Sequence, residues 1–502
     1  MTQFSSIDLR SVRIDRDQQE TIFSQLCRQL RELVLSGDLP LDARLPSTRM
    51  LSSEIGISRI TVREVYEQLI AEGLLISTPG KGTFVSCHSG VLEAISAHTN
   101  EAPVTTATET LSAVEHISKR ARAFLSLPLG SSAREPLPFN PSVPDLKLFP
   151  SAKWNTVVRK SLLNHKYESM DYGDPLGFPE LREALAHYLR LSRGIKCDAS
   201  QIIITASSEQ TIRRTVFLLL DEADSVCFGE PGIYSRRYAF SSTGVNTITL
   251  PVDDQGVVVK SIYKHGRNAK LAYVLPYRHY PLGITMSLQR RRELLEWANN
   301  NNSWILEDDF ASEFGLPENS PPPIQSLDEN QRVIYMGGFS LTLFPALRLS
   351  YVVYPRSLLK AAESIAKSEL SVSTALQPAL ADFIANDHYV THIRNMRKVY
   401  QRREDFLLQY LNQHLDNRFS VSGMGGGTNL VLDLPPHICA NDLSQSLARH
   451  NIIAYPASSY YLGNPLEQNT RNALVLGFAS SSRDKLEISA ALLMEEIRNL
   501  DF

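Results

Sequence analysis

The chain of 502 residues is too long for one hydrophobic core, so we expect two or three domains, at least one of them a large α/β unit. Hydrophobic residues make up 43% of the chain and charged residues 21%, which is enough apolar surface to bury sizeable cores. A formal net charge of -3 argues against a protein that coats nucleic acid or membrane with its whole surface, so any DNA contact must be local.

The cysteines and the first residues indicate a reducing, cytoplasmic environment. Five cysteines are scattered along the chain without CxxC spacing or histidine partners, which predicts free thiols and neither a disulfide framework nor a metal site. Residues 1–19 lack the apolar core of a signal peptide, and no apolar run is long enough to span a bilayer. We therefore expect a cytoplasmic protein with no membrane partner. The cysteines are Cys27, Cys87, Cys197, Cys227 and Cys439.

Three helices, with a tight turn between the second and the third, are predicted near the N-terminus. Apolar residues recur at helical spacing over residues 21–36. In LPSTRMLSSEIGISRITVREVYEQLIAEG, Ser47 can cap a short helix, Gly56 ends it, and Ser58 can cap the next. An apolar stripe on this third helix is expected to face inward. Its members are Val62, Val65, Tyr66, Leu69 and Ile70.

The third helix and the segment after it carry groups that suit DNA. Arg59, Thr61 and Arg63 point away from the apolar stripe, and they place a hydroxyl between two guanidinium groups. Such groups match base edges and phosphates in a major groove. The following LLISTPGKGTFV predicts two short strands around a glycine-containing turn, where Lys81 adds charge and the glycines permit close approach to phosphate.

This N-terminal segment resembles the winged helix-turn-helix domain of GntR-type bacterial regulators over roughly residues 17–87. The match runs almost throughout LPSTRMLSSEIGISRITVREVYEQLIAEGLL and GKGTFV. The resemblance implies a domain that binds double-stranded operator DNA. The residues that it implicates in DNA contact are Arg49, Arg59, Thr61, Arg63, Gly80, Lys81, Gly82 and Thr83.

Residues 88–135 predict a linker, because periodicity weakens and NEAPVTTATET cannot bury much apolar surface. From residue 136 onward, short β-rich runs alternate with helical stretches such as RRRELLEWANN; the runs are QIIIT, SVCF, LAYVLP, WILEDD and VIYMGG. This alternation predicts an α/β domain with a mostly parallel sheet and ligands beyond the carboxyl ends of the strands. The tail, with a long helical stretch and the runs NLVLDLP and ALVLGFA, predicts a separate α+β subdomain.

Residues 136–502 resemble the fold-type I aminotransferases, and the two domains together resemble the MocR/GabR subfamily of GntR regulators. The resemblance rests on YGDPLGFPELREALAHYLRLSRGIKCDASQIIIT, EDDFASEFG and RVIYMGGFSLTLFPALRLSYVVYP. In that subfamily the large domain binds pyridoxal phosphate and small effectors and usually acts as a sensor. The resemblance also implies a homodimer built through the large domains, with an effector that the sequence does not identify.

Several positions depart from the subfamily pattern around the cofactor. The pattern places the imine-forming lysine at Leu341, whose side chain has no nucleophile, so a Schiff base cannot form there. The tyrosine that donates to the cofactor phenolate is replaced by Phe310, which forfeits a hydrogen bond worth on the order of 1 kcal/mol. Asp308 matches the carboxylate that pairs with the pyridinium nitrogen. A carboxylate held by backbone amides at a strand end explains Asp308 equally well.

The phosphate loop and the substrate side depart as well. The loop becomes TASSE, in which Ser207 lacks the conformational freedom of glycine and Glu209 would oppose a phosphate at the start of a helix unless it turned away. Ser208 and Arg348 are the remaining candidate phosphate ligands. The other replaced positions are Ile233 at the stacking aromatic, Arg278 and His279 in YRHYPLG, and Val475 at the arginine that clamps a substrate carboxylate.

We therefore expect a DNA-binding transcriptional regulator and not an enzyme. Its aminotransferase-like domain is expected to have lost covalent pyridoxal phosphate chemistry and to serve dimerisation, with or without ligand sensing. A second interpretation is a regulator that still binds pyridoxal phosphate noncovalently through Asp308 and Arg348, with or without a lysine from elsewhere. A working aminotransferase is the third, and Leu341 and Val475 together argue against it.

Overall fold

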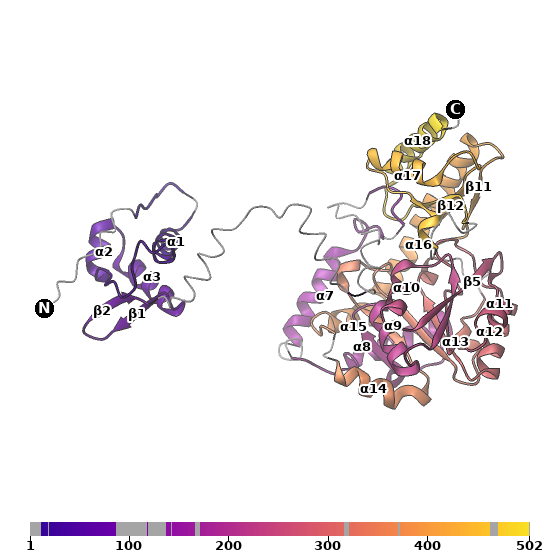
Figure 1. The fold of residues 1–502 in the computed structure, drawn as a ribbon, viewed down its shortest axis with the longest axis horizontal. Helices are drawn as coiled ribbons and strands as arrows, with labels where there is room; N and C mark the ends of the chain where they lie inside the picture. The colour runs from indigo at the N-terminus through magenta and orange to yellow at the C-terminus, as the bar shows by residue number, and fades with distance from the viewer. Residues whose placement is uncertain are drawn as a thin grey trace. The chain divides into compact units, whose positions relative to one another are not determined.

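The computed structural model describes residues 12–18, 20–86, 118, 137–141, 143–165, 171–315, 321–369, 372–461 and 470–500. The chain divides into two compact units, residues 1–127 and 128–502, which are drawn in Figure 1. Apart from residue 118, the predicted linker 88–135 lies outside the described residues.

The N-terminal unit is a helix-turn-helix, as the sequence predicts. Its helices are α1 (Ile22–Leu35), α2 (Thr48–Ile55) and α3 (Arg59–Ala71). The Ser47 hydroxyl accepts a hydrogen bond from the Met50 amide, and the Ser58 hydroxyl accepts one from the Ile60 amide, both at 3.2 Å. Between the helices Gly56 adopts φ +67°, a left-handed conformation that glycine enters without steric cost. These local interactions fix the turn.

Hydrophobic residues of all three helices form the core of this unit. The predicted inward stripe of α3 is buried except for Ile70, which is only partly covered. The strands β1 (Leu75–Thr78) and β2 (Gly82–Val85) pair antiparallel and form the predicted wing, with Leu75 opposite Val85. The wing packs through Leu75 and Val85 on the same core, so its turn is held relative to α3.

The large unit is built on an eight-stranded sheet in the order β3-β10-β9-β8-β7-β4-β5-β6. The strands from β9 to β5 are parallel, whereas β10 runs antiparallel to both β3 and β9, and β6 runs antiparallel to β5. The five β-rich runs predicted from the sequence are β3, β4, β7, β8 and β9. In chain order the strands are β3 (Ile202–Thr205), β4 (Ser225–Glu230), β5 (Asn246–Asp253), β6 (Gly256–Val257), β7 (Leu271–Val274), β8 (Trp304–Asp309), β9 (Val333–Gly338) and β10 (Ser350–Val353).

Helices cover both faces of this sheet (Figure 1). One face packs on α9, α10 and α14, and the other on α8, α11, α12, α13 and α15. Successive side chains of a strand point to opposite faces, so Leu306 and Asp308 of β8 face α9 and α10. The helices are α7 (Ser151–Asn164), α8 (Pro179–Arg193), α9 (Ser208–Leu219), α10 (Tyr234–Ser241), α11 (Lys260–His265), α12 (Leu288–Asn300), α13 (Ile324–Leu327), α14 (Leu359–Ser368), α15 (Gln377–Ala385) and α16 (His388–His414).

The C-terminal part forms the predicted α+β subdomain. A four-stranded antiparallel sheet in the order β11-β12-β14-β13 is accompanied by two helices, which Figure 1 shows in yellow and orange. Its elements are β11 (Ser420–Ser422), β12 (Asn429–Asp433), α17 (Ala440–Arg449), β13 (Tyr455–Pro456), β14 (Ala473–Gly477) and α18 (Arg483–Leu500). Over the described residues, none of the helices combines the length and the apolar character that crossing a membrane requires.

Candidate DNA-binding surface and cofactor-site region

The starts of α2 and α3 bring the predicted DNA-contacting arginines together. Arg49 and Arg59 are exposed, and Arg59 Nε donates to the Thr48 hydroxyl at 3.3 Å, which links the two helix starts. Arg63 lies one turn further along α3, where its exposed guanidinium is 3.7 Å from Glu67. Thr61 is half-buried beside them. Surface ion pairs of this kind are weak, so these guanidinium groups can exchange partners at little cost.

The wing adds a second basic element. Gly80, Lys81, Gly82 and Thr83 lie on its turn and second strand, and the Lys81 amide closes the turn on the Thr78 carbonyl at 3.0 Å. A Cβ atom at Gly82 would lie 2.9 Å from Nε of Arg44, so the glycine makes room for this exposed arginine. Arg44 could not be predicted from the sequence. A β-bridge between residue 44 and Phe84 places it against the wing, and this bridge is visible only in the structure.

One further residue that the sequence analysis missed is Ile60. It lies between Arg59 and Thr61 at the start of α3 and is 59% exposed, although isoleucine is usually buried. An apolar side chain at the start of a recognition helix suits the methyl group of thymine. The signal was available in the sequence, since Ile60 lies outside the inward stripe of α3.

In the large unit, the predicted lysine position lies in an apolar environment. Leu341 follows β9 in the chain and packs in the main hydrophobic core with 6% of its surface exposed. Phe310 follows β8, and its ring meets the ring of Tyr280 edge-on at 5.4 Å between centroids. The Tyr280 hydroxyl is engaged with that of Tyr460 at 3.0 Å. Leu341 therefore offers only hydrocarbon contacts at the position where catalysis would need a nucleophile.

The carboxylate of Asp308 is held by two partners within the protein. Tyr273 donates its hydroxyl to Oδ2 at 2.7 Å, and Arg236 of α10 donates Nε to the same oxygen at 3.1 Å. The other end of the guanidinium forms an ion pair through Nη1 with the carboxylate of Glu209, on the first turn of α9. Arg236 therefore bridges two carboxylates that are far apart in the chain.

Burial and pairing set the ionisation of this bridge. Burial raises the pKa of Asp308, and this outweighs the opposing effects of Arg236 and Tyr273. For Glu209, burial would raise the pKa, but Arg236, the backbone amide of Glu209 and the hydroxyls of Ser235 and Ser207 together lower it to about 2. Burial disfavours the charged form of Arg236, yet the two carboxylates dominate and raise its pKa. The Glu209–Arg236 ion pair is therefore charged at neutral pH.

Ser207 adopts a conformation that does not require the freedom of glycine. Its backbone is extended at φ -168° and ψ 164°, a conformation open to any residue, so glycine is not needed there. Its hydroxyl caps α9 by accepting from the Gln210 amide at 3.2 Å. The Glu209 carboxylate stays at the start of α9 and pairs there with Arg236. Ser208 is buried, whereas Arg348 is exposed in a left-handed conformation at φ +50°; its backbone amide donates to the Pro345 carbonyl, and its side chain forms no hydrogen bond or ion pair with a described residue.

The remaining replaced positions have structural roles. Arg278 is buried and donates to the Gly423 carbonyl at 2.6 Å, so it ties the large sheet to the glycine-rich loop before β12. The His279 ring contacts the Pro231 carbonyl at 2.6 Å through Nε2, and burial lowers its pKa to about 4, which leaves it neutral. Val475 is fully buried on β14 among hydrophobic side chains.

These observations test whether the site fits pyridoxal phosphate. The carboxylate that would receive a pyridinium nitrogen already pairs with Arg236, and an anionic side chain lies at the helix start that would receive a phosphate. No lysine stands at position 341, and no arginine at position 475. As these side chains lie, the residues do not fit the cofactor.

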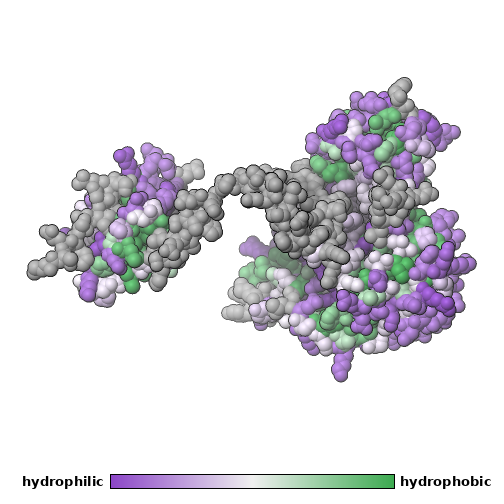
Figure 2. Space-filling model, in the orientation of Figure 1, coloured by the Kyte–Doolittle hydropathy of each residue, from purple (hydrophilic) through white to green (hydrophobic). Residues whose placement is uncertain are grey.

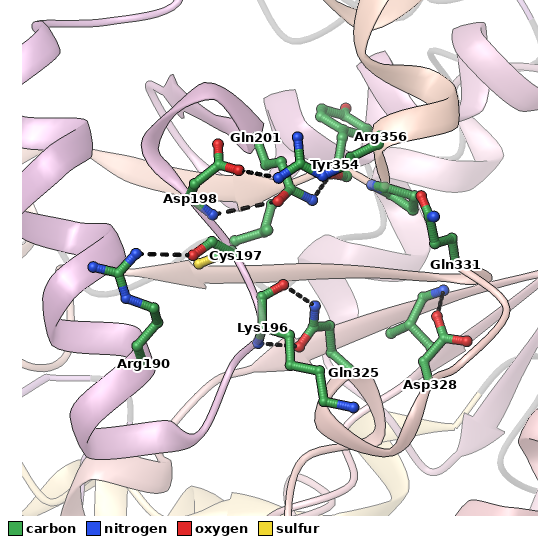
Figure 3. Close-up of a pocket in the computed structure, with 13 residues that line it drawn as sticks. Arg190, Lys196, Cys197, Asp198, Gln201, Gln325, Asp328, Gln331, Tyr354 and Arg356 are labelled. Carbon is green, nitrogen blue, oxygen red and sulfur yellow. Dashed lines mark hydrogen bonds and ion pairs between the residues drawn. The ribbon is translucent and has the colours of Figure 1, made fainter.

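A cavity of about 470 Å³ lies at the opposite end of the strands from Asp308, and Figure 3 shows residues that line it. It lies where β3 and β9 begin, whereas Asp308 lies where β8 ends. Charged groups around it are engaged: Arg356 pairs with Asp198, and Arg190 donates to the Cys197 carbonyl at 3.3 Å. The side chain of Gln325 exchanges two hydrogen bonds of 3.0 Å with the backbone of Lys196. This cavity is separate from the region around Asp308.

Comparison with known families agrees with both units. The family described as bacterial regulatory proteins, gntR family, matches residues 23–85, and the family described as aminotransferase class I and II matches residues 145–490. Among solved structures, a Pyrococcus horikoshii kynurenine aminotransferase is similar with a TM-score of 0.68 and 24% identity, covering 77% of this chain and 98% of that one. At that identity the likeness establishes the fold.

Two relatives match nearly end to end. The probable rhizopine catabolism regulatory protein MocR of Rhizobium meliloti is 30% identical over 467 residues, covering 93% of this chain and 92% of its own. An uncharacterized HTH-type transcriptional regulator of Bacillus subtilis (strain 168), YdeL, is 31% identical over 466 residues, covering 93% of this chain and 94% of its own. Both units are thus shared in the same order.

Proposed function

Because the chain belongs to the MocR-like regulators of the GntR family, and is accordingly a DNA-binding transcriptional regulator, we propose that its aminotransferase-like domain works without covalent pyridoxal phosphate and without catalysis. The main support for this proposal is that Leu341, at the position of the missing nucleophile, is buried in an apolar core. Phe310 and Val475 support it, because the phenolate donor and the carboxylate clamp are lost as well.

For the N-terminal domain, we assign DNA contact to the exposed groups at the starts of α2 and α3. Arg59 and Arg63 would reach base edges or phosphates, with Ile60 between them against a thymine methyl group. Arg44, beside the wing, would add a phosphate contact. Together they form a local basic surface, which a chain with a net charge of -3 needs in order to bind DNA.

We further propose a homodimer built through the large domains. The visible face of the large unit is mainly hydrophilic, with small hydrophobic groups between (Figure 2). One short stretch of chain nevertheless exposes several large apolar side chains, which supports an interface there. Tyr172 is 74% exposed and Leu163 is 60% exposed. The other members are Leu146, Leu148 and Leu162.

A spectrum of the purified protein with added pyridoxal phosphate tests the proposal. We expect no imine absorption band, because position 341 has no amine, and no conversion of amino acids to oxo acids. An imine band that appears at one equivalent and survives removal of free aldehyde would contradict the proposal. Binding without an imine band would favour the second interpretation, which would require Arg236 to leave Asp308.

A further inference from the structure

The Glu209–Arg236 pair lies at the start of α9 and against Asp308, the two positions that the family resemblance assigns to a phosphate and a pyridinium nitrogen. We propose that this pair substitutes for pyridoxal phosphate, with the carboxylate in place of the phosphate and the guanidinium in place of the pyridinium. The inference deepens the proposed cofactor-free domain and depends on it. It states in addition what fills the charged positions of the site.

Arg236 is the cationic half of the substitution, and it lies against Asp308. The subsequence EDD ends β8 and delivers this carboxylate to the face covered by α9 and α10, where a pyridinium nitrogen would need it. Arg236 Nε donates to it at 3.1 Å, and only 2% of the Asp308 side chain is exposed. A second cation could approach this carboxylate only by displacing Arg236, because buried like charges repel strongly.

The anionic half is at the start of α9. The first amides of a helix carry unsatisfied N–H groups and a partial positive charge, which attract phosphates and carboxylates. The Glu209 carboxylate uses this environment: it interacts with its own backbone amide and with the hydroxyls of Ser207 and Ser235, in addition to Arg236. A phosphate arriving here would meet a negative charge already in place.

The bridge also supplies a mechanical connection. Arg236 of α10 joins the start of α9 to the end of β8, through Glu209 and Asp308, which are 27 and 72 residues away in the chain. A cofactor bound by its phosphate and its ring nitrogen would connect the same two elements, the start of α9 and the end of β8. With the connection made by side chains, the site is assembled without a ligand.

A neighbouring ion pair shows what an ordinary structural bridge looks like. Arg237, the next residue of α10, is buried and pairs with Glu230 at 3.3 Å. Neither of these residues is at a helix start that could receive a phosphate or against Asp308. This second pair therefore provides a matched control.

Pyridoxine 5′-phosphate tests the substitution, because it carries the phosphate and the ring nitrogen but no aldehyde, so it cannot form imines with lysines. We expect the full-length wild-type protein not to bind it, as measured by equilibrium dialysis and by the thermal midpoint. In the double variant Glu209→Ala/Arg236→Ala, both charged positions are vacated. The double variant should bind the probe at least about tenfold more tightly than wild type and gain thermal stability from it.

The double variant Glu230→Ala/Arg237→Ala should lose stability without gaining binding. The inference would be overturned if wild type and the Glu209/Arg236 variant bound pyridoxine 5′-phosphate equally, or if the two double variants did. A folded Glu209/Arg236 variant that does not bind the probe would also overturn it. Should that variant fail to fold, the milder Glu209→Gln removes only the negative charge. It is expected to bind the probe more tightly than wild type does, and an unchanged affinity would overturn the inference. An imine band from wild type with pyridoxal phosphate would instead refute the proposed function.

Discussion

In the N-terminal unit the arginines at the start of α3 are exposed, and their interactions within the protein are weak, whereas in the large unit Arg236 is only 12% exposed and lies between two carboxylates. The first arrangement leaves charge available to a phosphate backbone. The second consumes charge internally, because a buried guanidinium needs a partner. The arginines at the start of α3 therefore offer their charge outward, whereas that of Arg236 is neutralised by its two carboxylates.

The largest effect is expected from removing the guanidinium of Arg236, which should lower the stability of the large domain. Arg236→Ala leaves the buried Asp308 and the partly exposed Glu209 without their common cation, so we expect a loss of about 3 to 5 kcal/mol in the free energy of unfolding of the large domain. Urea denaturation would measure it. The matched control is Arg213→Ala, an exposed arginine on α9, which should change stability by less than about 0.5 kcal/mol. Equal losses would show that the bridge does not contribute.

Buried charge in the large domain also predicts a dependence on pH. Burial raises the pKa of Glu307 from 4.5 to about 7, although two backbone amides donate to it. Because the folded pKa lies above the unfolded one, its stabilisation is complete below about pH 4.5 and is lost as the pH rises through about 7.

Between pH 5 and 8 the variant Glu307→Gln should therefore show a weaker fall in stability than wild type, by on the order of 3 kcal/mol. Urea denaturation at a series of pH values would measure the difference in slope. The lost acceptor costs the variant a similar amount at every pH, so it shifts the level and not the slope. Parallel curves for the two proteins would contradict the assignment.

The exposed arginines provide the next test. Arg59→Ala and Arg63→Ala should each weaken operator binding while the fold stays intact. A lost bidentate base contact should cost about 1 to 3 kcal/mol, and a lost phosphate contact should lower the slope of log affinity against log salt by about 1. Arg28→Ala, at an exposed arginine on α1, serves as the control. Operator affinity unchanged in both α3 variants would refute the assigned surface.

The smallest expected effect is on catalysis. Leu341→Lys alone should give no measurable transamination, because the phenolate donor at position 310 and the carboxylate clamp at position 475 are still missing and Arg236 still holds Asp308. Turnover would be assayed on protein whose sedimentation matches wild type, with Leu341→Met as the control for altered packing. Ordinary turnover in the lysine variant would mean that one substitution separates this domain from an enzyme.

The helix-turn-helix, five strands of the large sheet and the absence of the imine-forming lysine could all be predicted from the sequence alone. Ser47, Gly56 and Ser58 set the helix-turn-helix through contacts with residues two to four positions away, so their effect could be predicted from the sequence. The β-rich runs predicted five strands of the large sheet, and the absence of lysine at position 341 is a fact of the sequence.

The pairing of Arg236 with its two carboxylates depends on the tertiary structure and could not be predicted from the sequence. Arg236 is 27 residues from Glu209 and 72 from Asp308, and its partners depend on α9 and α10 covering the same face of the sheet. In the sequence, SRRYAF gives two adjacent arginines with no sign that they take different carboxylates. The backbone of Ser207 was likewise undetermined, because its extended conformation follows from the junction between β3 and α9. Local interactions can be predicted from neighbouring residues, whereas buried ion pairs depend on how distant segments pack.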